Sequence, residues 1–375
     1  MNSTTDSAET HTDFGPNFYA RKLQTVQHSG QFDLIILGPG DILRSTTGIA
    51  ESTHERFAAL AITATKNFAI FPATDDTVIA TSILPKLNIP TIYWRDGQDP
   101  ISMLKDELAG FEPQRIGFDA ALRGDHLLAL QRAFPNAKFD TVDALFAIKE
   151  PEELRELASV GAAIDRVHAQ VPALLRAGRT EAEVAGVLEQ LILKEHVAVD
   201  FIIVGSGPNG AMPHHSYGDR TLQPGDCVVV DIGGTNAAGY HSDCTRTYIV
   251  DGERSLVDPE ILQAYEVLQQ AQQEATAAIR PGMTAGDIDA ITRGIIAEAG
   301  LGQYFTHRTG HGIGVSTHEP PFIAAGAEVV LHPGMVFSIE PGIYIPDNFG
   351  MRIEDIVAVT ADGVEVLNQQ PRILR

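Results

Sequence analysis

The chain has 375 residues, which is longer than one hydrophobic core usually supports, so two domains are expected. Its hydrophobic content of 44% and mean hydropathy of -0.02 are typical of a globular protein, and no apolar run approaches the ~20 residues that a membrane span requires. The formal net charge of -22 argues against nucleic acids and anionic membranes as partners, because both would repel the chain. Only Cys227 and Cys244 are present and the N-terminus has no apolar signal core, which indicates a reducing cytoplasm.

Residues 1–14 are rich in Ser, Thr, Asp and Glu without periodicity, which predicts a disordered tail. In residues 15–148, short apolar stretches of high β-propensity alternate with helical stretches such as 125–134, and this alternation predicts a small mixed α/β domain. The expected strands are 32–37, 57–63, 68–71, 91–94 and 115–118.

A second domain, residues 149–375, is expected to open on a long amphipathic helix. Pro151 suits the first helical turn because the N–H that it lacks would have no partner there, and Glu152 and Glu153 favour the positive end of the helix dipole. Apolar residues then recur at spacings compatible with one buried helical face, namely Leu154, Leu157, Gly161, Ile164, Val171 and Leu175.

The second domain contains an internal repeat. The segment Arg-Ala-Gly-Arg-Thr at 176–180, which precedes a helical stretch, is echoed by Arg-Pro-Gly-Met-Thr at 280–284 before another helical stretch. Further on, in both halves, a Pro-Gly pair opens an apolar run that ends in an acid, at 224–231 and at 333–340. Pro-Gly turns before strands are common, but several features that repeat in the same order indicate an internal duplication.

Each half of the repeat carries two acids beside apolar, β-prone runs. In the first half, Asp231 follows such a run and Asp243 precedes one. In the second half, Glu340 and Glu354 occupy the corresponding two places. Four carboxylates that converge in a core repel one another and are costly to desolvate unless cations neutralise them. The pattern therefore predicts a pair of divalent metal ions.

His311 is the fifth candidate ligand. It lies in Arg-Thr-Gly-His-Gly-Ile-Gly at 308–314, where the flanking glycines allow close backbone approach and leave the imidazole accessible. One nitrogen among four carboxylates makes a hard, oxygen-rich set that suits Mn²⁺, with Co²⁺ or Zn²⁺ as alternatives. Taken singly, an acid at a strand end is usually a cap and a lone histidine is usually structural, so the prediction depends on the joint pattern.

These segments resemble the superfamily of creatinase, prolidase, aminopeptidase P and methionine aminopeptidase, whose catalytic domain is called the pita-bread fold. The N-terminal domain also looks like the one that the prolidase and creatinase branches carry. The expected fold class is therefore α/β (α+β), with a creatinase-like mixed α/β domain before a pita-bread domain that has an internal pseudo-two-fold repeat. The motifs that carry the resemblance are Val230-Asp-Ile-Gly233, Ser242-Asp243, Gly310-His-Gly312, Ile339-Glu-Pro-Gly342 and Arg352-Ile-Glu354.

The resemblance implies a division of roles among the five candidate ligands. Asp231 would chelate one metal, His311 and Glu340 would chelate the other, and Asp243 and Glu354 would bridge both. A water or hydroxide held between the metals, with its pKa lowered toward neutrality, would attack the scissile carbonyl. Glu340 would also be the proton shuttle.

Two further histidines resemble family residues that contact the substrate carbonyl and stabilise the developing oxyanion. They are His214, in Gly-Ala-Met-Pro-His-His at 210–215, and His318, in Ser-Thr-His-Glu-Pro-Pro at 316–321. His215 competes with His214 for this role, and the family pattern favours His214 because it directly follows a small apolar residue and Pro. Neither His214 nor His318 is expected to ligate metal.

Three other residues are expected to bind substrate or to form hydrogen bonds with the metal-binding side chains. His307 resembles a histidine that lines the proline pocket in this branch. Arg352, two residues before Glu354, is expected to orient a ligand carboxylate through a bidentate pair. Tyr240 is expected to form a hydrogen bond in the same surroundings. For all three, an ordinary place in a buried polar network is the alternative.

The resemblance implies a metallopeptidase that cleaves the Xaa-Pro bond at the N-terminus of dipeptides or short peptides. An amide to proline has no N–H, so ordinary proteases reject it and a dedicated pocket is expected. The expected ligand is a small peptide with proline at the second position, and the expected assembly is a homodimer. The sequence leaves open whether the enzyme is a dipeptidase or accepts longer peptides, which metal it uses and which first residue it prefers.

Two other functions are compatible with the same fold, because a fold alone does not determine function. One is creatinase-like hydrolysis of another C–N bond, but such branches characteristically lose metal ligands and all five are present here. The other is a non-catalytic binding protein, against which the intact ligands and both site histidines argue. Cys227 and Cys244 are expected to be small buried hydrophobes rather than nucleophiles.

Overall fold

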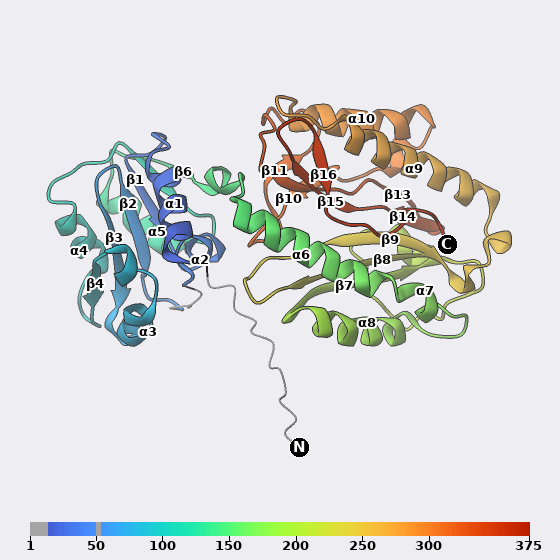
Figure 1. Ribbon diagram of the computed structural model, residues 1–375, viewed down its shortest axis with the longest axis horizontal. Coiled ribbons are helices and arrows are strands. Elements are labelled where there is room, and N and C mark those ends of the chain that lie inside the picture. Colours follow the sequence, from blue (N-terminus) through green and yellow to red (C-terminus); the bar gives the residue numbers. More distant parts are fainter. Residues whose placement is uncertain (1–13, 50–53) are drawn as a thin grey trace, which may run out of the picture. The chain divides into compact units, whose positions relative to one another are not determined.

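The computed structural model describes residues 14–49 and 54–375, and the chain divides into two compact units, Asp13–Phe146 and Ala147–Arg375 (Figure 1). The division follows Phe146, whereas the sequence suggested a boundary after Ile148. The predicted disordered tail, residues 1–14, lies outside the described residues except for Phe14. Within 14–49 and 54–375, no helix combines the length and the apolar character needed to cross a membrane.

The first unit is built on a six-stranded sheet with the order β4-β3-β2-β1-β5-β6. It is a mixed sheet, because β1 pairs with β2 antiparallel and with β5 parallel. The five predicted strands are all present, but β6 was not predicted, since its sequence Lys-Phe-Asp-Thr is mostly polar and lies at the sheet edge. The strands are β1 (Leu34–Leu37), β2 (Ala59–Thr63), β3 (Asn67–Pro72), β4 (Thr91–Trp94), β5 (Arg115–Phe118) and β6 (Lys138–Thr141).

Helices cover both faces of this sheet, because successive strand residues point to opposite sides. Ile35 and Leu37 are buried in one core together with residues of α1, α2 and α3, whereas Leu34 and Ile36 are buried in a second core with residues of α4 and α5. The predicted helix 125–134 corresponds to α5. The helices are α1 (Pro16–Gln27), α2 (Asp41–Thr47), α3 (Asp76–Thr81), α4 (Pro100–Glu107) and α5 (Gly124–Ala133).

The second unit opens on the predicted amphipathic helix, α6 (Pro151–His168). A capping box closes its first turn, and Leu157 and Ile164 are buried on one face. The helix ends earlier than the apolar pattern suggested. A separate short helix, α7 (Val171–Leu174), follows, because Pro172 cannot supply the N–H that a continuous helix requires.

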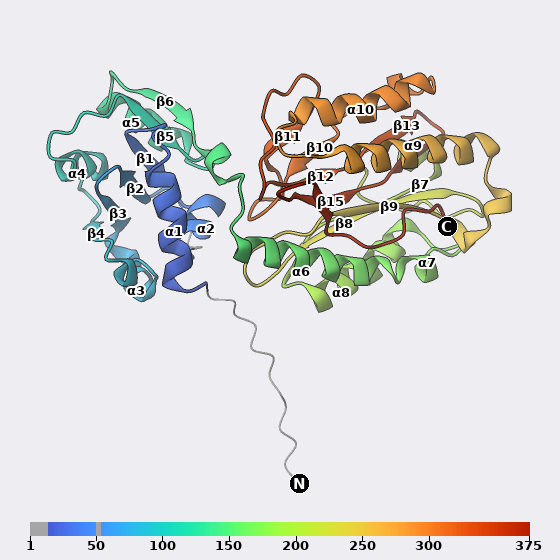
Figure 2. The same cartoon turned by 45° about the horizontal axis from the view of Figure 1, so that its top comes forward.

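The strands of the second unit lie between two groups of helices. Their three sheets are β7-β8-β9, β11-β10-β12-β15-β16 and the hairpin β13-β14. The helices α6, α7 and α8 lie on one side of these strands and α9 and α10 on the other (Figure 1, Figure 2). These elements are α8 (Glu181–Glu195), β7 (Ala198–Ser206), β8 (Cys227–Thr235), β9 (Cys244–Ile249), α9 (Pro259–Ala278), α10 (Ala285–Glu298), β10 (Gly310–Gly312), β11 (Glu319–Ile323), β12 (Val336–Ile339), β13 (Gly342–Ile345), β14 (Phe349–Arg352), β15 (Asp355–Val359) and β16 (Val364–Val366).

The repeat seen in the sequence is also present in the structure. Gly178 and Gly282 both adopt a φ of +91° in the turns before α8 and α10, and Thr180 and Thr284 cap these two helices through capping boxes. In each half, the N–H of this glycine donates to a leucine carbonyl just before the repeated Pro-Gly turn. Each half then supplies a pair of antiparallel strands, β8 with β9 and β12 with β15, beside which the four predicted acids lie.

Candidate active site

A cleft of about 1130 Å³ in the second unit brings the predicted site residues together. Its lining includes all five candidate ligands, and it also includes His214, His307, His318 and Arg352. Of the residues predicted for the site, Tyr240 does not line the cleft.

The first half of the repeat contributes Asp231 and Asp243 from neighbouring strands. Asp231 lies inside β8 rather than at its end, because Gly233 and the residues up to Thr235 stay paired with β7. Asp243 directly precedes β9, and Asp231 is paired across the sheet with Thr245 of that strand. Antiparallel pairing thus places the two acids close together.

The second half contributes three side chains from adjacent strands. His311 lies on β10, which pairs with β12. Glu340 follows Ile339, the last residue of β12, and Glu354 precedes Asp355, the first residue of β15. Ile339 and Asp355 are paired across the two strands. Glu340 and Glu354, each next to one member of this pair, therefore lie at the same end of the neighbouring strands.

The side chains of Asp243, His311 and Glu354 converge, with one possible ligand atom of each within 4.8 Å of the others. His311 Nε2 lies 3.8 Å from Asp243 Oδ2 and 3.3 Å from Glu340 Oε1. The Nδ1 atom of His311 faces the carbonyl oxygen of Gly312 at 3.1 Å, so Nδ1 carries the proton and Nε2 presents its lone pair to the carboxylates. A metal-ligating histidine requires this orientation.

Burial shifts this cluster toward its uncharged forms. Burial lowers the pKa of His311 to about 3, and it raises the pKa of Glu340 to about 7. Burial and the charges of neighbouring acids raise the pKa of Asp243 and of Glu354 well above the usual range. A set of crowded acids around a neutral imidazole nitrogen is stabilised when divalent cations neutralise it, so the residues fit metal ions.

Asp231 is oriented by Arg352, whose Nη2 donates to Asp231 Oδ2 at 2.6 Å. Asp231 Oδ1 is buried and has no hydrogen-bond partner among the described residues, which fits an atom that coordinates a metal. The bidentate pair predicted for Arg352 is not formed. Only one of its nitrogens reaches Asp231, because Nε donates to Thr245 and Nη1 donates to Tyr344.

Tyr344 connects Arg352 to His307, the residue predicted to line the proline pocket. The Tyr344 hydroxyl accepts from Arg352 at 2.6 Å and lies 2.9 Å from His307 Nε2. His307 Nδ1 faces the carbonyl oxygen of Arg308 at 2.7 Å, so Nε2 is the acceptor for the Tyr344 hydroxyl. Burial lowers the pKa of His307 to about 4 and keeps its ring neutral. Tyr344 was not predicted from the sequence, because a tyrosine in a short apolar strand has no signature of its own.

Tyr240 is buried and does not line the cleft. Its hydroxyl donates to Glu153 Oε1 at 3.0 Å. Glu153 belongs to the capping box of α6, so Tyr240 joins the segment before Asp243 to the start of that helix.

The adjacent residues His214 and His215 have different surroundings. His214 is exposed and lines the cleft, whereas His215 Nε2 lies 2.9 Å from Glu181 Oε2. Glu181 is fully buried in the first turn of α8, and it accepts hydrogen bonds from several groups of the loop that carries both histidines. The role of Glu181 was not predicted from the sequence, because an acid in a first helical turn is usually solvated. Its other hydrogen-bond donors are the backbone and hydroxyl of Ser206, the amide of Asn209 and the backbone of Gly218.

His318 is exposed in the cleft, with its ring centroid 3.8 Å from that of His311. Its Nδ1 lies 3.4 Å from Arg308 Nη2 and accepts from it, so the proton of a neutral His318 is on Nε2. Burial and the positive charge of Arg308 lower the pKa of His318 and favour this neutral form.

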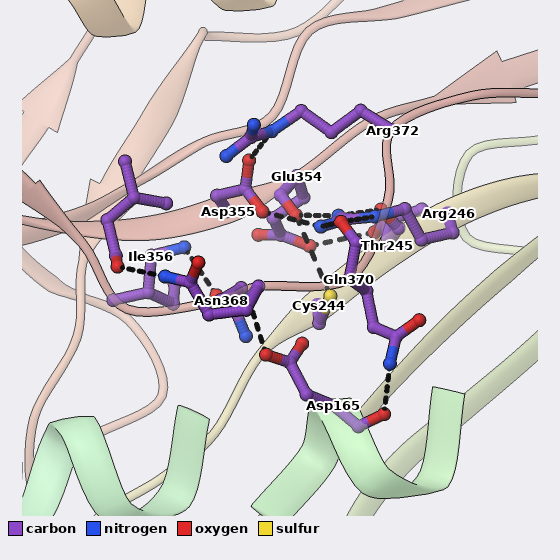
Figure 3. Close-up of polar contacts among 12 residues, drawn as sticks. Asp165, Cys244, Thr245, Arg246, Glu354, Asp355, Ile356, Asn368, Gln370 and Arg372 are labelled. Carbon is purple, nitrogen blue, oxygen red and sulfur yellow. Dashed lines mark hydrogen bonds and ion pairs between the residues drawn. The ribbon is translucent and has the colours of Figure 1, made fainter. Parts of the chain in front are cut away.

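A buried network of charges lies behind the cluster and joins the two halves of the repeat (Figure 3). Arg246 of β9 donates to Asp355 Oδ1 at 2.6 Å and to the carbonyl oxygens of Glu354 and Gln370. Arg372, near the C-terminus, donates to the other oxygen of Asp355. These bonds hold the backbone at Glu354 and therefore the position of its carboxylate.

Both cysteines are buried, as predicted for small hydrophobic residues. Burial raises the pKa of Cys227 to about 12 and the pKa of Cys244 well above its usual range. Neither thiol is therefore a thiolate near neutral pH, and the Cys244 sulfur lies 3.7 Å from the carbonyl oxygen of Glu354.

Two family models match consecutive parts of the chain. Residues 155–361 match metallopeptidase family M24, and residues 21–149 match the creatinase/prolidase N-terminal domain. A solved structure of dipeptidase PepE from Mycobacterium ulcerans has a TM-score of 0.92 and 43% sequence identity, and the match covers 96% of this chain and 98% of that one. The fold is therefore the predicted pita-bread domain preceded by a creatinase-like domain.

Curated relatives match over nearly the whole length. A probable dipeptidase PepE from Mycobacterium tuberculosis is 45% identical over 370 residues, which covers 96% of this chain and 97% of the relative. An Xaa-Pro dipeptidase from Lactobacillus helveticus is 35% identical over 368 residues, which covers 94% and 97%. The matched catalytic family uses divalent metal ions, and the convergent acids and imidazole described above fit that chemistry. This chain belongs to metallopeptidase family M24.

Proposed function

We propose that this protein is a dinuclear metal-dependent Xaa-Pro dipeptidase, which hydrolyses the bond between a first residue and a following proline. The observation that carries the proposal is the cleft in which Asp243, His311 and Glu354 converge beside the exposed histidines His214 and His318. Its specificity for proline is supported by two relatives named Xaa-Pro dipeptidase, from Lactobacillus helveticus at 35% identity and from Pyrococcus furiosus at 40% identity over 238 residues.

Five side chains would hold two divalent ions, for which manganese is the proposed metal, because one nitrogen among oxygen donors makes a hard ligand set. When bound, the ions would neutralise the acids, polarise the scissile carbonyl and lower the pKa of a water molecule. The unpartnered Oδ1 of Asp231 and the lone pair on His311 Nε2 support this ligand set. The residues that would hold the ions are Asp231, Asp243, His311, Glu340 and Glu354, all of which line the cleft.

The remaining residues of the cleft orient the substrate and move the proton. His318, protonated on Nε2, donates a hydrogen bond to the oxygen of the scissile carbonyl, and His214 contacts the same group. Glu340 accepts a proton from the attacking water and delivers it to the proline nitrogen as the C–N bond breaks. The products are a free amino acid and proline.

His307 and Arg352 support this reaction from the sides of the cleft. The neutral imidazole of His307, fixed by Tyr344, would pack against the proline ring. Arg352 would hold Asp231 in the orientation that leaves Oδ1 for the metal. Arg352 is therefore a positioning residue.

The proposal extends to the setting of the enzyme. It is a cytoplasmic homodimer, and its ligand is a small peptide with proline at the second position. The two free, buried cysteines support the reducing compartment, and the net charge of -22 supports a small peptide rather than a nucleic acid.

The test is an assay of the metal-reconstituted protein on Ala-Pro, on an Ala-Pro-Yaa tripeptide and on a methionyl peptide without proline. We expect cleavage of Ala-Pro, much slower cleavage of the tripeptide and none of the methionyl peptide. Protein treated with a chelator is the control. Cleavage of the tripeptide but not of Ala-Pro would replace the dipeptidase by an aminopeptidase P, and failure on both proline substrates would reject the proposal.

A further inference from the structure

Two guanidinium groups line the cleft, and they differ in what they contact. Arg352 is buried, and its Nε, Nη1 and Nη2 all donate to protein groups. Arg308 is half-buried, and its side chain contacts the ring of Phe322 and the imidazole of His318. Among the described residues, no carboxylate lies within ion-pair distance of Arg308. Among the described residues that line the cleft, Arg308 is therefore a guanidinium that forms no ion pair with a protein acid, although its charge partly offsets the rise that burial causes in the pKa of Glu340.

The position of the Arg308 charge is fixed by its two contacts. Its Cζ lies 4.6 Å from the ring centroid of Phe322, which is 41% exposed and supports the guanidinium from one side. Its Nη2 donates to His318 Nδ1 at 3.4 Å. No acceptor within the described parts of the chain is bonded to Nε or Nη1, so both remain able to donate to a ligand.

Arg308 lies where the C-terminal carboxylate of a bound dipeptide could reach it. His318 lies between Arg308 and His311, since it accepts from the former and its ring centroid is 3.8 Å from that of the latter. In the proposed reaction, His318 contacts the scissile carbonyl. In an Xaa-Pro dipeptide the carbon of the free carboxylate is three bonds from the scissile carbonyl carbon, so less than about 4 Å separates them. A cation that contacts His318 is therefore within reach of that carboxylate.

We propose that Arg308 binds the C-terminal carboxylate of the substrate and thereby makes the enzyme selective for dipeptides, an inference that rests on the proposed Xaa-Pro dipeptidase activity. A planar guanidinium offers parallel N–H donors that match the two oxygens of a carboxylate. A tripeptide or a dipeptide amide places a neutral carbonyl group at the same position. Either substrate leaves the desolvated Arg308 charge without its partner, which disfavours binding.

The experiment compares Ala-Pro with its amide, Ala-Pro-NH₂, on the metal-loaded wild-type protein and on the variants Arg308→Gln and Arg308→Lys. We expect the wild type to prefer the free acid. Arg308→Gln raises KM for Ala-Pro about 10- to 100-fold, the loss typical of a charge-assisted hydrogen bond, and changes KM for the amide much less. Arg308→Lys keeps part of the preference, because it restores the charge but not the paired donors.

Arg254→Gln is the matched control. Arg254 belongs to the same unit, its side chain is 51% exposed, and it is not among the residues that line the cleft. This variant removes one positive charge and should leave the kinetics of both substrates unchanged. It separates a local effect of Arg308 from a general effect of net charge.

Three results would overturn the proposal. They are a wild type that does not prefer the acid over the amide, an Arg308→Gln variant with unchanged kinetics, and equal losses on the two substrates. The last result would indicate that Arg308 acts only through His318.

Calorimetric titration with proline and with prolinamide separates this inference from the proposed function. If Ala-Pro is not cleaved, but the wild type binds proline more tightly than prolinamide and Arg308→Gln loses that difference, the carboxylate site stands and the proposed reaction fails. If Ala-Pro is cleaved and no difference between the two ligands is found, the reaction stands and the carboxylate site is rejected.

Discussion

His311 differs from His168 and His307 in the direction of its lone pair. Burial lowers the pKa of His168 to about 3, of His307 to about 4 and of His311 to about 3, so all three rings are neutral near pH 7. The lone pairs of His168 and His307 face a tyrosine hydroxyl, whereas that of His311 faces acids. Geometry rather than burial alone therefore distinguishes the candidate ligand.

The first prediction concerns the proposed ligands. His311→Ala and Asp243→Ala should each abolish hydrolysis of Ala-Pro and lower the bound metal, because each removes a donor from the cluster in which their side chains converge. Metal content and turnover are measured side by side, and circular dichroism checks the fold. His332→Ala, at an exposed histidine of the same unit, is the control. Unchanged turnover in either ligand variant would reject the metal assignment.

The second prediction concerns pH. The folded pKa of His168 is about 3 against an ordinary value of 6.5, so below pH 6.5 the unfolded chain binds a proton that the folded chain does not. The contribution of His168 to stability is therefore complete above that pH and falls as the pH decreases. Between pH 7 and pH 5 the loss is about 2 kcal/mol.

The variant His168→Gln tests this effect, because glutamine offers one donor and one acceptor to Cys244 and Tyr248 and does not titrate. Urea unfolding at pH 7 and pH 5 should show a smaller pH dependence in the variant by about 2 kcal/mol. The titration of the cleft acids is common to both proteins and cancels in the comparison. An identical pH dependence would contradict the prediction.

At the scale of elements, the loop between β7 and β8 is shaped by a single carboxylate from α8. Burial alone would raise the pKa of Glu181, but hydrogen bonds from Ser206 and His215 outweigh this effect and lower it. The loop that binds Glu181 also carries His214 into the cleft. Glu181, which does not line the cleft, thus positions His214, which does.

The third prediction is that Glu181→Gln lowers kcat/KM for Ala-Pro by about 10- to 100-fold, because the loop loses the charge that gathers its donors and His214 moves. Metal content should stay unchanged, since the loop contributes no proposed ligand. Glu183→Gln, in the same helix and in its capping box, is the control and should affect stability more than turnover. A loss of metal in Glu181→Gln would contradict a role through His214.

The fourth prediction concerns the junction of β9 and β15 (Figure 3). Arg246 and Asp355 are both buried, with side chains 1% and 0% exposed, so Arg246→Met should lower the free energy of unfolding by about 3–5 kcal/mol. Metal affinity should also fall, because the carbonyl of Glu354 loses its donor. Denaturant titration and metal-competition measurements test the two effects.

The pair Arg166–Glu195, whose side chains are 57% and 28% exposed, provides the control for this variant. Arg166→Met should cost at most about 1 kcal/mol, because solvent screens a partly exposed pair. Similar losses in Arg246→Met and Arg166→Met would contradict the role assigned to the buried network.

At the scale of the whole molecule, metal binding should stabilise only one of the two units. The residues that line the cleft all belong to Ala147–Arg375, and each unit has hydrophobic cores of its own. The fifth prediction is that a saturating divalent metal raises the unfolding temperature of this unit alone. At a free metal concentration about 1,000 times Kd, the stabilisation is about 4 kcal/mol. Differential scanning calorimetry with metal and with chelator measures it, and equal shifts of both units would contradict the prediction.

The sequence by itself determined the features that depend on local chemistry. Apolar runs placed five of the six strands of the first unit, Pro151 marked the start of α6, and the repeated segments before α8 and α10 revealed the duplication. The five candidate ligands could also be proposed from the sequence, because a ligand needs a particular residue type at a particular strand position. All five of these side chains line one cleft.

Only the tertiary structure decided which other polar residues join the site. Tyr240 and Tyr344 are both buried tyrosines of the second unit, yet one contacts Glu153 and the other contacts Arg352 and His307. Arg352 meets Asp231 across 121 positions of sequence. Such contacts are set by how the two halves of the repeat pack, and neither helical periodicity nor strand alternation carries information about that packing.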